Sequence, residues 1–130
     1  MDKFNLLDRL IGEHMDELRQ VCRTAPDLDW IPGTRVFFEY FASNYLFFST
    51  MLASKGSPSF RSRFVEFLIE EFRSEVDTTA HKNRGLHDDV IVQFVATAYV
   101  GVLEWWLSNG MPYPPRVMAA ELGILQERNL

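Results

Sequence analysis

Apolar residues recur along the chain at the three- and four-residue intervals of an α-helix, and no stretch shows the alternation of a β-strand. In residues 4–22 the apolar face is flanked by charged side chains, which predicts an amphipathic helix. Residues 24–33 contain two prolines and a glycine and predict a connector. Residues 33–53 carry large apolar side chains on more than one side, which is typical of a helix surrounded by other helices.

A third helix with one polar face is predicted from Pro58 onward, with Ser57 as its N-cap. The polar segment 77–85 has no apolar period and predicts a mobile loop.

The fourth predicted helix starts near Leu86 and ends at Asn109-Gly110, a pair that favours the left-handed conformation at a helix end. Pro115 is suited to begin a fifth helix. We therefore expect one all-α domain over residues 1–130, an antiparallel bundle of about five helices.

Composition and charge narrow the function classes. A net charge of -5 argues against direct nucleic-acid binding, which needs a concentrated basic face. The uncharged run 90–103 spans about 14 residues, whereas a membrane span needs about 20, so we expect a buried core helix and no membrane. The N-terminus lacks the features of a signal peptide, and Cys22 is the single cysteine, which together predict a cytoplasmic protein without a disulfide.

No catalytic or metal-binding constellation emerges from the sequence. The histidines are His14, His81 and His87, and none has a second ligand-type side chain at the position four residues after it. His14 lies on the apolar face of the first helix and is interpreted as a packed, hydrogen-bonded core residue. His87 is assigned to a charged helix start and Cys22 to a half-buried structural thiol. We expect no catalytic residue, no metal and no cofactor.

Aromatic residues, 14% of the chain, are concentrated in the second and fourth predicted helices together with a few polar groups. Helical bundles that bind small apolar molecules combine these features, although plain core packing is the favoured interpretation of any single aromatic residue. Ser43 and Asn44 either contact such a molecule or bond the carbonyls of their own helix.

The fourth helix is apolar around its whole circumference from residue 90 to residue 107, more than the other helices can cover. Trp105 and Trp106 point about 100° apart, so both cannot enter one narrow core. Ala98 and Gly101 are small enough to let another helix approach closely. We therefore predict a symmetric homodimer that covers the remaining surface.

Three motifs in this order resemble the TetR family of transcriptional regulators, in a Firmicutes-type C-terminal subtype. DKFNLLDRLIGEHMDEL (2–18) resembles the helix that follows the DNA-reading helix. FFEYFASNYLFFSTML (37–52) resembles the aromatic second helix, and AYVGVLEWWLSNGMPYPPRVMAAEL (98–122) the closing helix pair. Pro114 departs from the family pattern, which has Ser or Thr at that position.

The resemblance implies an effector-sensing, dimerising domain that contacts DNA only through an N-terminal helix-turn-helix, which we expect to be absent from this chain. Its small apolar or aromatic effector is expected at Phe37, Tyr40, Phe41, Tyr45, Phe64, Phe94 and Tyr99. Homodimerisation through the last two helices is expected at Phe94, Ala98, Gly101, Val102, Trp105, Met118, Leu122 and Leu125.

Two alternatives stay open at this point. One is a helical protein–protein interaction module that binds no small molecule. The other is a small helical enzyme, for which the sequence offers no paired carboxylates and no nucleophile with a base.

Overall fold

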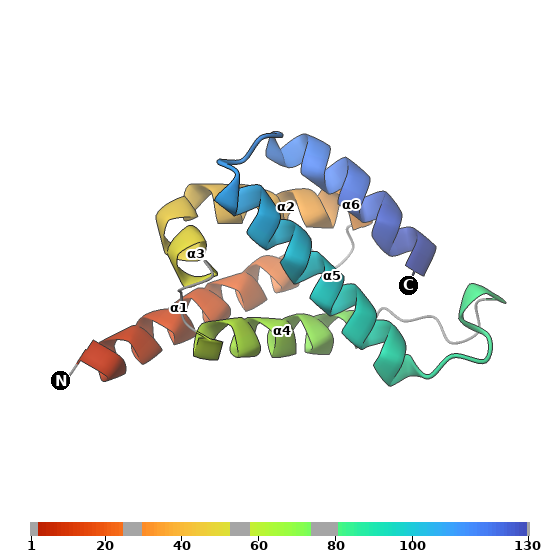
Figure 1. Ribbon diagram of the computed structural model, residues 1–130, viewed down its shortest axis with the longest axis horizontal. Helices are drawn as coiled ribbons and strands as arrows, with labels where there is room; N and C mark the ends of the chain where they lie inside the picture. The colour runs from red at the N-terminus through yellow and green to blue at the C-terminus, as the bar shows by residue number, and fades with distance from the viewer. Residues whose placement is uncertain (1–2, 25–29, 53–57, 74–80, 130) are drawn as a thin grey trace.

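The helices of this chain cross one another around a shared aromatic core (Figure 1). The structure is a computed structural model and describes residues 3–24, 30–52, 58–73 and 81–129; within these ranges there is no strand. The elements are α1 (Lys3–Thr24), α2 (Trp30–Ser43), α3 (Tyr45–Met51), α4 (Pro58–Arg73), the 3₁₀ helix η1 (His81–Asn83), α5 (Asp88–Ser108) and α6 (Pro115–Asn129). The predicted all-α fold class is confirmed.

Helices α2 and α6 lie side by side and run in opposite directions. The Thr34 hydroxyl near the start of α2 donates to Gln126 Oε1 near the end of α6 at 3.0 Å, and both side chains are buried. Lys82 of η1 donates to the backbone carbonyl of Glu127. The last turns of α6 are therefore held from two sides.

Helix α4 packs antiparallel to α5 and also contacts α1. Arginines along α4 form ion pairs with both neighbouring helices, and each pair contributes only about 0–1 kcal/mol because it is exposed to solvent. The pairs are Arg61–Glu104 at 2.5 Å, Arg73–Asp89 at 2.8 Å and Arg63–Asp8 at 2.9 Å.

One helix is predicted over residues 33–53, but the structure has two helices in this region, because the helix is interrupted at Asn44. The backbone N–H and the side-chain amide of Asn44 both donate to the Tyr40 carbonyl, at 3.1 and 3.0 Å. The Ser43 hydroxyl donates to the Glu39 carbonyl at 2.9 Å. The two side-chain bonds compete with the backbone bonds of the helix and bend it, and α3 leaves at a new angle (Figure 1).

Helix α5 ends at Ser108, just before the predicted Asn109-Gly110 pair, but the left-handed residues lie one position later than predicted. Asn109 has φ -101, whereas Gly110 and Met111 adopt the left-handed region with φ 70 and 55. The Met111 N–H donates to the Trp106 carbonyl at 2.8 Å, which satisfies one of the last carbonyls of the helix. Pro115 begins α6 as predicted. The predicted N-cap Ser57 and residues 77–80 of the predicted loop lie outside the described residues, whereas residues 81–85 of that loop form η1 and a turn.

Within the described ranges, α5 alone is long and apolar enough to cross a membrane by length and composition. Half of its most apolar window is buried inside the chain, and the core helix of a soluble protein passes the same test. Helix α5 therefore has one apolar side that is buried in the core and a second apolar side that is exposed.

Candidate functional site

The two adjacent tryptophans of α5 lie in different surroundings. Trp106 is fully buried, its ring lies 5.0 Å from that of Phe38, and its indole N–H donates to the Tyr113 carbonyl at 2.8 Å. Trp105 is 48% exposed, with the Tyr113 ring 6.4 Å away. One indole is therefore part of the core and the other is part of the surface.

Trp105 ends a stripe of exposed residues along α5, which we call the α5 stripe. Phe94 in this stripe is 62% exposed, a large fraction for a phenylalanine side chain. The members recur at helical spacing and are Val90, Phe94, Ala98, Gly101 and Trp105. A patch of this kind on a soluble protein marks an interaction surface.

A shallow apolar hollow lies at the N-terminal half of the α5 stripe. It is lined by Asp89, Val90, Gln93, Phe94, Thr97 and Ala98, all from α5. Its lining residues in the described part of the chain all come from this one helix, and the hollow is wide open to the outside.

The opposite side of α5 enters a cluster of aromatic rings. Phe41 is fully buried and meets Phe38, Phe48 and Phe64 edge-to-face, with ring centroids 5.8, 5.1 and 5.9 Å away. These are the geometries that aromatic rings prefer. The rings fill the space between α2, α3, α4 and α5 with the chain's own side chains.

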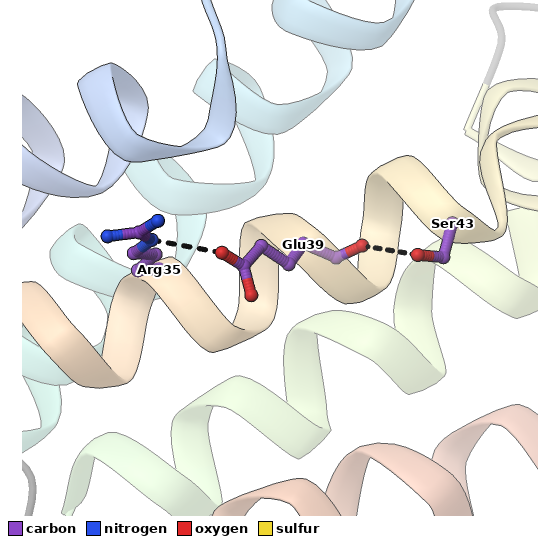
Figure 2. Close-up of polar contacts among 3 residues, drawn as sticks. All are labelled: Arg35, Glu39 and Ser43. Atoms are coloured by element: carbon purple, nitrogen blue, oxygen red, sulfur yellow. Dashed lines mark hydrogen bonds and ion pairs between the residues drawn. The ribbon is translucent and has the colours of Figure 1, made fainter.

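Of the two roles that the sequence left open for Ser43 and Asn44, the structure shows bonding to the carbonyls of their own helix. Figure 2 shows the outward side of α2, where Arg35 Nε donates to Glu39 Oε1 at 2.9 Å and the Ser43 hydroxyl donates to the Glu39 backbone carbonyl. Asn44 likewise bonds the Tyr40 carbonyl. Ser43 and Asn44 are thus occupied by their own helix.

A polar network connects α1 to α2 at the edge of the aromatic cluster. The Tyr40 hydroxyl donates to Glu17 Oε2 at 2.6 Å and lies 2.9 Å from His14 Nδ1. The imidazole stacks on Phe47 with ring centroids 3.9 Å apart. Burial, with smaller contributions from the hydrogen bond and the charge of Glu17, raises the pKa of the Tyr40 hydroxyl well above its usual value. The predicted packed, hydrogen-bonded His14 is confirmed.

Comparison with known proteins decides the family. A TetR-type family model, described as the C-terminal region of a transcriptional regulator, matches residues 29–128. This chain belongs to that family. No curated protein and no solved structure matches the chain.

The predicted dimer residues on α5 and those on α6 differ in how exposed they are. Phe94, Ala98, Gly101 and Trp105 are exposed in the α5 stripe, and Val102 is half-buried at its side. On α6, Leu125 is exposed, whereas Met118 and Leu122 are only 5% and 6% exposed. Met118 and Leu122 belong to the row of α6 that packs inward within the chain, whereas Ile124, which the sequence did not single out, is exposed.

The seven residues predicted to bind the effector lie in two parts of the structure. Phe41, Phe64 and Tyr99 are buried, and Phe37, Tyr40 and Tyr45 are half-buried around them. Phe94 is exposed on the α5 stripe and is not part of this cluster. The periodicity of α5 left both sides apolar and could not assign Phe94 to one of them.

Metal-ligand side chains are dispersed in the described part of the chain. No group of three His, Cys, Asp or Glu residues there is arranged to hold a metal ion. His87 is the N-cap residue of α5, and Asp88 and Asp89 occupy its first turn, as the sequence predicts. The side chains of His81 and Cys22 lie outside the described residues.

Replacing Tyr40 by phenylalanine is expected to lower the free energy of unfolding by about 1 kcal/mol, because His14 and Glu17 lose their shared partner. The raised pKa adds a pH signature. Above about pH 10 the unfolded tyrosine ionises while the folded one keeps its proton, so the stability from this group is full below pH 10 and is lost as pH rises. The free energy of unfolding, measured with urea between pH 9 and 11, should therefore fall more steeply with rising pH in the wild type than in Tyr40→Phe.

The matched control for this experiment is Tyr113→Phe, because the Tyr113 side chain is exposed. Its pH dependence should follow that of the wild type. Equal pH slopes for the wild type and Tyr40→Phe would contradict the role assigned to the Tyr40 hydroxyl.

Proposed function

We propose that this chain is the effector-binding and homodimerising domain of a TetR-type transcriptional regulator, and that the α5 stripe, with Ile124 and Leu125 of α6, is its dimer face. The observation that carries the proposal is the exposure of Phe94 and Trp105 on either side of Ala98 and Gly101. Aromatic residues are enriched in the buried parts of homodimer interfaces. In this proposal residues 1–130 form one domain that acts in the cytoplasm, without catalysis.

Gly101 supports a partner at this face. Apart from its chain neighbours and the nearby backbone of its own helix, a Cβ atom added at this position would meet nothing within 4 Å. Glycine inside a helix costs about 1 kcal/mol relative to alanine, and the surrounding chain here would accept alanine. A helix that approaches the backbone from outside gives a physical reason for the glycine.

We place the effector at the aromatic cluster, next to the His14–Tyr40–Glu17 network. The rings supply apolar walls, and the Tyr40 hydroxyl and the imidazole supply polar groups that can orient a small apolar or aromatic molecule. Because Phe41 and Phe64 pack ring against ring, the molecule must displace side chains on entry. Its binding then favours a different arrangement of the helices.

The signal in this proposal leaves through α1. That helix is attached to α2 through Tyr40 and to α4 through the Arg63–Asp8 ion pair. A change in the aromatic cluster changes the tilt of α1, and with it the spacing of two DNA-binding domains in a dimer. DNA contact is assigned to such a domain and not to this acidic region.

Sedimentation equilibrium at micromolar concentration tests the dimer. We expect twice the chain mass of 15.1 kDa. A particle of one chain mass at that concentration would remove the dimer from the proposal.

A thermal-melt screen against apolar and aromatic compounds tests the effector. A ligand at a hundred times its Kd should add about 2.7 kcal/mol of stability. Tyr45→Ala and the milder Phe41→Leu should each weaken binding, while Leu46→Ala on the exposed side of α3 should not. Unchanged affinity in both pocket variants would reject this placement, and no shift with any compound class would favour the interaction module.

A further inference from the structure

We infer that α5 pairs with its own copy in one antiparallel register, in which each Trp105 lies over the partner subunit's Phe94 and enters the hollow beside it. This inference rests on the proposed homodimer and specifies its geometry. Three features of the α5 stripe carry it: the order of large and small residues, the glycine, and the position of the hollow.

From Phe94 to Trp105 the α5 stripe has the same order of large and small residues in both directions, aromatic, small, small, aromatic. The midpoint between Ala98 and Gly101 is also the midpoint between Phe94 and Trp105. At 1.5 Å per residue, each aromatic residue lies about 8 Å from that midpoint along the helix axis. A two-fold axis through the midpoint therefore places Trp105 of each copy opposite the partner subunit's Phe94.

The small residues lie where this arrangement needs them. Two crossing helices approach most closely at the two-fold axis, and there the α5 stripe presents Ala98 and Gly101, both exposed. The space around a Cβ atom added at Gly101 is open within the chain, so its own fold does not require glycine. Close contact between two backbones does require small side chains. The aromatic residues on either side then fill the widening gap between the helices.

The hollow lies where the partner's indole would arrive. The lining residues that the structure describes run from Asp89 to Ala98 and lie on both sides of Phe94. In the antiparallel register this hollow faces Trp105 of the other copy. The walls are mostly apolar, and Gln93 adds an amide that can accept the indole N–H at the edge.

Other arrangements leave these features unused. A parallel pair places Trp105 against Trp105 and Phe94 against Phe94, and each hollow then faces a second hollow. A lipid surface gives no reason for small residues at the centre of the stripe. The antiparallel pair uses the small residues, both aromatics and the hollow at once.

Complementary charges at the two aromatic positions test the register. Phe94→Asp, labelled with a fluorophore at its N-terminus, should be monomeric because a carboxylate enters an apolar contact. We expect Trp105→Lys to recruit it into a heterodimer, where the introduced ammonium faces the introduced carboxylate and the second Trp105–Phe94 contact is intact. The matched control Trp105→Asp removes the same indole with the opposite charge and should bind at least tenfold more weakly in fluorescence anisotropy titrations.

Phe94→Lys separates this register from the alternatives. If it recruits Phe94→Asp as well as Trp105→Lys does, residue 94 faces its own copy and the inferred register is wrong. If neither lysine variant recruits Phe94→Asp while the wild type is dimeric, the register fails and the dimer stands. A monomeric wild type rejects the underlying proposed function. Because both positions are exposed, circular dichroism should show unchanged helix content in all variants.

Discussion

Trp106→Ala is expected to lower the free energy of unfolding by about 3–5 kcal/mol, the largest loss of stability that we expect from a single substitution in this chain. The indole is fully buried, packs against Phe38 and donates to the Tyr113 carbonyl in the turn before α6. Its removal leaves a cavity and an unpaired carbonyl. Domains of this size are stable by about 5–15 kcal/mol, so the variant should be close to unfolding at physiological temperature. Urea denaturation at one fixed protein concentration measures the loss.

Trp106→Phe is the informative companion to this variant. It keeps an aromatic ring near Phe38 and removes the indole N–H, so it should cost less than Trp106→Ala. If Trp106→Ala is no more destabilising than a change at the exposed Trp105, the assignment of the two indoles to core and surface is wrong.

Trp105→Ala is expected to raise the Kd of the proposed dimer about a thousandfold while leaving the fold of one chain unchanged. A buried aromatic anchor contributes about 2 kcal/mol or more to an interface. A two-fold dimer contains two copies of the contact, and about 4 kcal/mol corresponds to about three powers of ten in Kd. Sedimentation velocity across a dilution series measures this change.

Leu46→Ala serves as the control for this second experiment. Leu46 is an exposed apolar residue outside the α5 stripe, on α3, and its removal should leave the dimer unaffected. A Trp105→Ala chain that dimerises as tightly as the wild type would exclude the α5 stripe as the dimer face.

The apolar periodicity of the sequence predicts where the helices lie, but it predicts which side of a helix is buried better for α5 than for α6. On α5 the small and aromatic residues exposed by the structure are those that the sequence singled out for the interface. On α6 apolar residues occur on both sides, and the sequence does not show which row packs on α2. The inward row includes Gln126, a polar residue that becomes favourable there only because Thr34 of the distant α2 supplies a donor.

The break at Asn44 and the role of Tyr40 show a second limit. Apolar periodicity continues through residues 43–45, so it predicts an unbroken helix, whereas side-chain bonds to the Glu39 and Tyr40 carbonyls end α2. The sequence places Tyr40 among the effector residues, but its hydrogen bonds to His14 and Glu17 depend on how α1 crosses α2. No spacing within either helix contains that information.

The Thr34–Gln126 bond also determines how far the chain can be shortened from its C-terminal end. A version that ends before Gln126 leaves the buried Thr34 hydroxyl without its acceptor and removes the carbonyl that Lys82 binds. The last turn of α6 therefore connects two segments that are remote in the sequence, and its deletion would destabilise the packing of the start of α2.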